Sequence, residues 1–160
     1  MCRKIKNIEG ECMSNEIKML VFMIGDQFYS GDIMEVERIL NYEELAELPD
    51  SPQFLKGIMN YEGNILPVIS LSEKFNRFTN EKSNDSKIIV TRDGDRKIGI
   101  IVDSVSEVKS VKEEVIEESP EMVADISKRY IKGFIKEKDR IIIFLSLSTI
   151  LSEDEKELVY

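Results

Sequence analysis

Few side chains in this sequence could carry out chemistry, and almost all of them are carboxylates. There is no histidine, which excludes an imidazole base, an imidazole metal ligand and a serine–histidine triad. Cys2 and Cys12 lie in a polar leader without the further ligands of a zinc site, so we expect free thiols there. The glycines are scattered singly, and the sequence contains no phosphate-binding loop.

The remaining catalytic candidates are acidic residues of two kinds. Asp103 could act as a carboxylate in a cleft, whereas the others form a cluster in a polar linker. The cluster consists of Glu113, Glu114, Glu117 and Glu118. Adjacent like charges in a linker usually form a solvated surface, so we predict no enzymatic activity, no bound metal and no cofactor.

The apolar residues follow a pattern typical of strands, and the chain is organised around one hairpin. From Ile65 to Leu71, apolar side chains line both sides of an extended segment. Just before this segment, Gly63 can adopt a positive φ. We therefore predict a hairpin with the arms 55–61 and 64–71.

A second copy of this hairpin follows seventy-six positions later. Residues 130–151 align with 54–75 without a gap, and six positions are identical. The identical pairs are Lys56/Lys132, Gly57/Gly133, Ile65/Ile141, Ser70/Ser146, Leu71/Leu147 and Ser72/Ser148. We interpret the match as an internal duplication; the alternative is that any two hairpins rich in Ile, Val and Leu look alike.

The duplication continues upstream of the hairpins. Gly25-Asp26 aligns with Gly94-Asp95, and the apolar residues that follow are spaced by three in both copies. They are Ile33, Val36 and Ile39 in the first copy and Val102, Val105 and Val108 in the second. Strict alternation cannot keep this spacing on one face, so we expect a bulge or bend near Met34 and Glu35 within a predicted strand over 28–40.

Three short helical segments are predicted from their capping residues. Residues 41–44 resemble a capping box and predict a helical turn over 43–48. Ser72 is a suitable cap for a short helix after the first hairpin. Residues 152–155 form a capping box that predicts a final helix over 152–159.

Composition and length indicate one folded body. With 160 residues, 42% of them hydrophobic, the chain can bury a core, whereas each repeat alone would bury too little surface to be secure. A formal net charge of -9 argues against a nucleic-acid ligand, which binds mainly through Lys and Arg. The longest apolar run, 19–24, is too short to cross a bilayer, and the leader lacks the apolar centre of a signal peptide. We expect a soluble cytoplasmic protein.

We divide the chain into three parts. A flexible tail covers 1–15, a duplicated domain 16–152 and a terminal helix 152–160. The repeats within the domain are 17–78 and 87–151. The distribution of strands between the repeats is left open, because duplicated barrels can exchange an edge.

Taken in order, these motifs resemble CheW, the family of coupling proteins in bacterial chemotaxis. The likeness runs from Glu16 to Leu151. It is carried by Leu20-Val-Phe, Gly25-Asp26, Asp32-Ile33, Phe54-Leu-Lys-Gly-Ile, Ile65-Leu-Pro-Val-Ile-Ser-Leu and the run from Gly99 to Val111. The resemblance implies an all-β, CheW-like fold of two pseudo-symmetric five-stranded β-barrels of the Src homology 3 type, with short helices after each hairpin and at the C-terminus.

The resemblance also implies a function and partners. CheW proteins are scaffolds that join the regulatory domain of the histidine kinase CheA to the cytoplasmic hairpin tips of chemoreceptors. We therefore expect a non-enzymatic adaptor, monomeric alone, that is recruited to membrane-associated receptor arrays without inserting into the membrane. An adaptor of another pathway such as surface motility, a small-ligand or enzymatic barrel, and an oligonucleotide-binding barrel are the alternatives.

The binding surfaces implied by the family fall into two sets. The receptor groove, suited to a helical face, corresponds to Ile33, Val36, Ile39, Val105 and Val108. The kinase contact corresponds to the first hairpin, at Gly57, Ile58, Asn60, Tyr61, Glu62, Gly63 and Pro67. For each apolar member of these sets, interior packing is the alternative.

Two departures from the family pattern occur together. The family hairpin usually reads Asn-Leu-Arg-Gly, whereas residues 60–63 read Asn-Tyr-Glu-Gly, with Glu62 in place of the arginine. Arg38 stands where the family usually has an acid. We predict that Arg38 and Glu62 form an ion pair with the charges exchanged; the alternative is independent drift at two solvent-facing sites.

Overall fold

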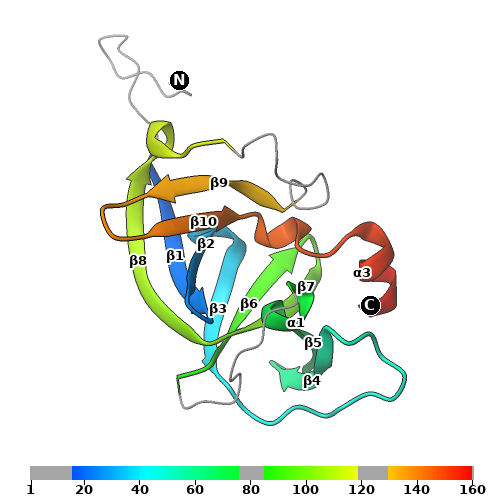
Figure 1. Ribbon diagram of the computed structural model, residues 1–160. Coiled ribbons are helices and arrows are strands. Elements are labelled where there is room, and N and C mark those ends of the chain that lie inside the picture. Colours follow the sequence, from blue (N-terminus) through cyan, green and yellow to red (C-terminus); the bar gives the residue numbers. More distant parts are fainter. Residues whose placement is uncertain (1–15, 76–84, 119–129, 160) are drawn as a thin grey trace.

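The computed structural model describes residues 16–75, 85–118 and 130–159, which form a mainly β structure (Figure 1). The strands are β1 (Glu16–Ile24), β2 (Gln27–Asp32), β3 (Val36–Asn41), β4 (Leu55–Tyr61), β5 (Asn64–Ser70), β6 (Lys87–Asp93), β7 (Arg96–Val102), β8 (Ser104–Lys112), β9 (Ile131–Lys136) and β10 (Ile141–Leu145). The helices are α1 (Leu71–Lys74) and α3 (Glu153–Val159), and 3-10 turns cover Ile33–Glu35, Glu113–Val115 and Leu147–Thr149. The predicted tail with Cys2 and Cys12 lies outside the described residues.

The strands form two five-stranded sheets with the same topology. The first sheet has the order β8-β1-β2-β10-β9, and the second has the order β3-β6-β7-β5-β4. If five is added to each strand number of the second sheet, and β11 and β12 are counted as β1 and β2, the strand order of the first sheet results. In each sheet one central pair is parallel, β10 with β2 and β5 with β7. This matching topology is the structural counterpart of the duplicated hairpin.

Each sheet contains strands from both halves of the chain, and the exchange takes place at bends. Between β2 and β3 the chain makes the 3-10 turn Ile33–Glu35, where the Asp32 side chain accepts a 2.9 Å hydrogen bond from the Met34 N–H. The predicted bend is therefore confirmed. The predicted continuous strand over 28–40 is wrong, because the chain crosses from the first sheet to the second at this bend.

One backbone bridge joins the outer strands of each sheet. Ala46, which follows β3, exchanges two 2.9 Å hydrogen bonds with Ile58 on β4. Glu117, which follows β8, exchanges two 2.8 Å hydrogen bonds with Phe134 on β9. The predicted helical turn over 43–48 is wrong, since Ala46 satisfies its backbone groups across the sheet edge and not within a helix.

The glycine that is identical in the two hairpins lies at these bridges. A Cβ atom on Gly57 would lie 2.5 Å from the carbonyl oxygen of Ala46, and one on Gly133 would lie 2.5 Å from that of Glu117. Both distances are too short for a side chain. The close approach of two backbone segments thus explains why both copies have glycine here.

Buried side chains of the described residues form three groups. One lies among β1, β8, β9 and β10, and contains Met19, Val21, Val111, Ile135, Ile142 and Phe144. A second lies among β4 to β7, and contains Met59, Tyr61, Leu66, Val68, Ile88, Val90 and Ile101. The third, here called the shared core, takes side chains from both sheets, including Leu20, Phe22, Ile24, Leu55, Ile69, Ile89, Ile100 and Leu145. Because of the shared core the two sheets pack as one body.

Both helices begin after a serine cap. The Ser70 hydroxyl accepts a 3.2 Å hydrogen bond from the Glu73 N–H, so α1 begins at Leu71 and its cap is not Ser72 as predicted. At α3, Ser152 and Glu155 exchange hydrogen bonds of 2.8 and 3.1 Å, which confirms the predicted capping box and final helix. Among the helices of the described segments, none has the length and apolar character needed to cross a membrane.

Candidate partner-binding surfaces

The β4–β5 hairpin carries the predicted kinase-contact residues. Glu62 and Gly63 form its turn with φ angles of 52° and 81°, the two consecutive positive values of a tight hairpin turn. Asn60, Glu62 and Gly63 are exposed and Ile58 is half-buried. The other members of the set, Gly57, Tyr61 and Pro67, are buried. The exposed part of this surface is therefore the tip of the hairpin.

The Tyr61 cluster supports the tip from below; we use this name for Glu37, Arg38, Tyr61, Glu62 and Lys97. The Tyr61 hydroxyl donates a 2.8 Å hydrogen bond to Glu37 on β3, and Lys97 Nζ on β7 lies 3.0 Å from the same carboxylate oxygen. Arg38 and Lys97 also lie over the tyrosine ring, 5.6 and 5.5 Å from its centroid. Side chains from β3 and β7 thus converge on one aromatic residue of β4.

The contacts within this cluster determine the protonation states of Glu37 and Tyr61 at neutral pH. The hydrogen bond from Tyr61 and the contact with Lys97 hold the pKa of Glu37 below its ordinary value. Burial and the hydrogen bond to Glu37 raise the pKa of Tyr61. Glu37 is therefore an anion and Tyr61 a neutral donor, the protonation states that their hydrogen bond requires.

Arg38 and Glu62 form the contact that the sequence predicts. Arg38 Nη2 lies 3.4 Å from Glu62 Oε2, and Glu62 Oε1 lies 3.8 Å from Lys97 Nζ. The side chains of Arg38 and Glu62 are 53% and 48% exposed. A pair this exposed adds about 0.2–1 kcal/mol to stability at most, so its consequences for the shape of the hairpin tip matter more.

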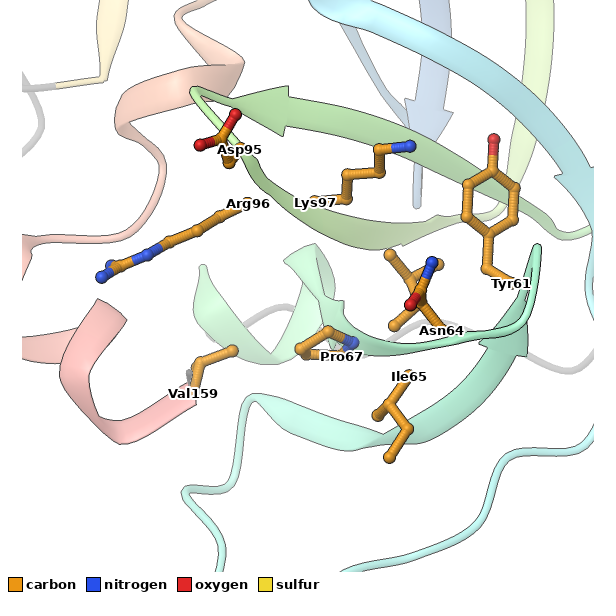
Figure 2. A pocket seen from close by; sticks show the side chains of 9 residues that line it. Tyr61, Asn64, Ile65, Pro67, Asp95, Arg96, Lys97 and Val159 are labelled. Atoms are coloured by element: carbon orange, nitrogen blue, oxygen red, sulfur yellow. The ribbon is translucent and has the colours of Figure 1, made fainter.

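A hollow of about 580 Å³ lies beside the hairpin, and it is lined by the hairpin, the β6–β7 turn and α3. Figure 2 shows Tyr61 and Lys97 toward one end of the hollow and Arg96 and Val159 toward the other. Ile65 is apolar and 72% exposed at its edge. Of the described residues that line the hollow, Asp95 is the sole carboxylate, so it lacks the paired acids of a general acid–base site.

The predicted receptor-contact residues lie on the bend and on strands β3 and β8. Ile33, Val36 and Val105 pack partly against the shared core, whereas Ile39 and Val108 are exposed. Val108, at 57%, is the more exposed of these two. Met34, at the bend, is an exposed apolar neighbour of this set. The sequence predicts a bend near Met34, but Met34 is not among the predicted receptor-contact residues.

Asp103, the predicted alternative for carboxylate chemistry, has a structural contact. Its carboxylate accepts a 2.7 Å hydrogen bond from the Gly25 N–H, and its own N–H donates to the Met23 carbonyl at 3.0 Å. Asp103 thus ties the β1–β2 turn to the bend between β7 and β8. Within residues 16–75, 85–118 and 130–159, no three acidic, histidine or cysteine residues are grouped so as to hold a metal ion.

The second hairpin has a charge cluster that the sequence analysis missed. Arg140 lies 2.6 Å from Glu107 on β8 and 2.6 Å from Glu137, and Lys109 pairs with Glu137 as well. Arg140 also lies over the Phe28 ring at 4.5 Å. We call these residues the Glu137 cluster. Glu107 aligns with Arg38 in the duplication, so both hairpins are tied to the matching strand by an ion pair, with opposite polarity.

Comparisons with known proteins give a consistent result. A family model described as the CheW-like domain matches residues 18–155. The "Chemotaxis protein CheW" of Klebsiella aerogenes is 32% identical over 155 residues, covering 97% of this chain and 92% of the relative. The protein of the same name from Thermotoga maritima is 30% identical over 138 residues, covering 86% and 89%. The crystal structure of the scaffolding protein TtCheW from Thermoanaerobacter tengcongensis has a TM-score of 0.80 at 33% identity and covers 92% of this chain and 99% of that one.

Proposed function

The chain belongs to the CheW-like family, and on that premise we propose that it is a non-enzymatic scaffold that couples chemoreceptors to the histidine kinase CheA. The observation that carries the proposal is a family match over nearly the whole length, on a fold with the same twin-sheet architecture as a solved scaffolding protein. The scaffold works at membrane-associated receptor arrays from the cytoplasmic side. Another pathway, or a small-ligand barrel, is not favoured.

The kinase regulatory domain binds the tip of the β4–β5 hairpin, at Asn60, Glu62 and Gly63. Support for this assignment comes from exposure at the tip together with the contacts of the Tyr61 cluster beneath it. A preorganised tip loses little conformational freedom on binding, which favours affinity. Gly57, Ile58, Tyr61 and Pro67 act through the shape of the hairpin, since they are buried or half-buried.

The helical receptor tip binds the apolar side chains along β3 and β8. Ile39 and Val108 supply exposed apolar surface, and an amphipathic helix binds such a surface through its apolar face. Ile33, Val36 and Val105 form the floor beneath them, because they pack partly against the shared core. A receptor that changes the position of its tip then shifts the population of kinase orientations held by the scaffold.

The decisive experiment measures both partners with one exposed substitution. Val108→Asp places a charge on the proposed receptor surface, and Val115→Asp places the same charge on a valine that is also exposed but lies outside it. We expect Val108→Asp to reduce receptor capture at least about tenfold, a typical loss at a central contact, while binding of the kinase regulatory domain stays unchanged. Val36→Asp is less informative, since Val36 packs partly against the shared core.

Two results would contradict the proposal. Wild-type protein that binds neither the purified kinase regulatory domain nor receptor fragments would remove the coupling function itself. Equal receptor capture by Val108→Asp and Val115→Asp would show that the receptor does not bind at β3 and β8, although the coupling function itself could still hold.

A further inference from the structure

Helix α3 belongs in sequence to the first sheet but lies against the hollow of the second. It follows β10 of the first sheet, yet Val159 in its last turn lines the hollow together with Ile65 and Pro67 of the β4–β5 hairpin. Figure 1 shows α3 (red) on the same side of the molecule as α1, β5 and β7. The last helix therefore completes a surface that the other sheet begins.

A mostly buried ion pair holds α3 in this place. Lys74 on α1 and Glu155 on α3 lie 2.5 Å apart, and Lys74 Nζ also lies 5.3 Å from the centroid of the Phe54 ring. Burial alone would raise the pKa of Glu155, but the contacts with Lys74 and Ser152 lower it overall. Removing one partner of such a pair leaves an uncompensated charge in a poorly solvated place, so the pair constrains where α3 can sit.

The chemistry of the hollow indicates what kind of group fills it. Ile65, Pro67 and Val159 supply apolar surface. Among the described residues that line the hollow, the charged side chains are two cations, Arg96 and Lys97, and one anion, Asp95. This slight positive excess contrasts with the formal net charge of -9 for the whole chain. An apolar side chain with a carboxylate beside it fits such a hollow best.

We propose that α3 is part of the kinase-binding surface and that the Lys74–Glu155 pair positions it. The hollow takes an apolar side chain, flanked by an acidic one, from the kinase regulatory domain. Continuity favours this partner over the receptor, because Tyr61 and Pro67 of the predicted kinase-contact set line the same hollow. This inference rests on the proposed coupling function and adds to it Val159, Glu155 and Lys74, which lie outside the β4–β5 hairpin.

The test compares kinase and receptor binding in variants of the full chain. Val159→Asp places a charge in the hollow, and Glu155→Lys breaks the ion pair, while Glu157→Lys makes the same charge change at an exposed position of the same helix. We expect Val159→Asp and Glu155→Lys to weaken binding of the purified kinase regulatory domain about tenfold in titration calorimetry, with receptor capture unchanged. Combining Lys74→Glu with Glu155→Lys restores the pair in reverse and should recover most of the affinity.

The outcomes separate this inference from the coupling function. Kinase affinity within about twofold of wild type for both Val159→Asp and Glu155→Lys would overturn it. So would a parallel loss of receptor capture, or a reversed pair that restores thermal stability without restoring kinase affinity, because both would indicate a purely structural role for α3. Failure of the coupling function itself would appear as wild-type protein that does not bind the kinase domain.

Discussion

Glu62 lies at a backbone position that suits glycine or asparagine better than glutamate. Its φ of 52° is in the left-handed region, which costs a non-glycine residue about 1–2 kcal/mol. The carboxylate lies within 3.8 Å of Lys97 and 3.4 Å of Arg38. Contacts with two cations from neighbouring strands give a reason for an acid at this strained position.

Reversing the two charges tests whether the Arg38–Glu62 pair acts as a unit. We expect Arg38→Glu and Glu62→Arg each to weaken kinase binding, because each places two like charges side by side at the hairpin tip. The double variant should recover affinity, while the free energy of unfolding changes by less than about 1 kcal/mol in all three. Calorimetric titration and urea unfolding measure the two quantities.

The exposed pair Lys136–Glu117, whose charged atoms lie 3.4 Å apart on the other sheet, provides the matched control. Its reversal should leave kinase binding unchanged. A double variant of Arg38 and Glu62 that binds no better than either single variant would show that the two charges act independently.

The family pattern was enough to predict the Arg38–Glu62 contact. Both positions carry the opposite charge to the usual family residue, and two such changes together indicate that the positions contact each other. It was not enough to predict the role of Glu37 or Lys97. These residues come from β3 and β7, and only the strand order places both beside the Tyr61 hydroxyl. Nothing in their local sequence distinguishes them from other charged residues on a strand.

The two hairpins differ in how exposed their ion pairs are. Both tips are tied to the matching strand, β3 or β8, but the pair at the first tip is about half exposed whereas the Glu137 cluster is mostly shielded. Shielded charges are screened less by salt than exposed ones. The ion pairs of the Glu137 cluster should therefore be less sensitive to salt than the Arg38–Glu62 pair, which is exposed at the tip where a partner can reach it.

Acid unfolding tests the contribution of the Glu137 cluster. Hydrogen bonds from Lys109 and Arg140 lower the pKa of Glu137 in the folded protein. The unfolded chain therefore binds a proton first as the pH falls, so the stabilisation is complete above the unfolded pKa of about 4.3 and is lost as the pH falls through the lower folded pKa. We expect Glu137→Gln to cost about 1 kcal/mol at neutral pH, and we expect this cost to shrink as the pH falls below the unfolded pKa, measured by urea unfolding.

Glu117→Gln is the control for this experiment, since Glu117 forms an exposed pair and lies on the same sheet edge. It should change stability little at either pH. A Glu137→Gln penalty that is the same at neutral and acid pH would show that lost packing, and not charge, causes the effect.

At the scale of the whole molecule, the exchange of strands makes the two halves depend on each other. Each sheet takes two strands from one half and three from the other. The shared core adds side chains from both sheets. Neither half can complete a sheet alone, so unfolding should be one cooperative transition.

Separating the halves tests this dependence. Fragments 16–84 and 85–160 should each lack a cooperative thermal transition, because each leaves strand edges unpaired and the shared core open. Mixing them in equal amounts should restore one transition in circular dichroism, at a concentration-dependent temperature. A fragment that melts cooperatively by itself would show that one repeat is an independent domain.

The local elements could be predicted from the sequence. Alternation and turn glycines located the hairpins, the Ser152–Glu155 capping box located α3, and the spacing of three at Ile33 and Val36 located the bend. These features depend on residues close together in the chain, whose preferences are visible without the fold.

Three features required the three-dimensional fold: which strands share a sheet, that Ala46 bridges to β4 while residues 43–48 form no helix, and that Val159 lines the hollow of the other sheet. Each of these depends on segments far apart in sequence meeting in space. Local propensity is too weak to specify such meetings, and burial of the shared core, together with satisfaction of backbone hydrogen bonds across the sheet edges, overrides it.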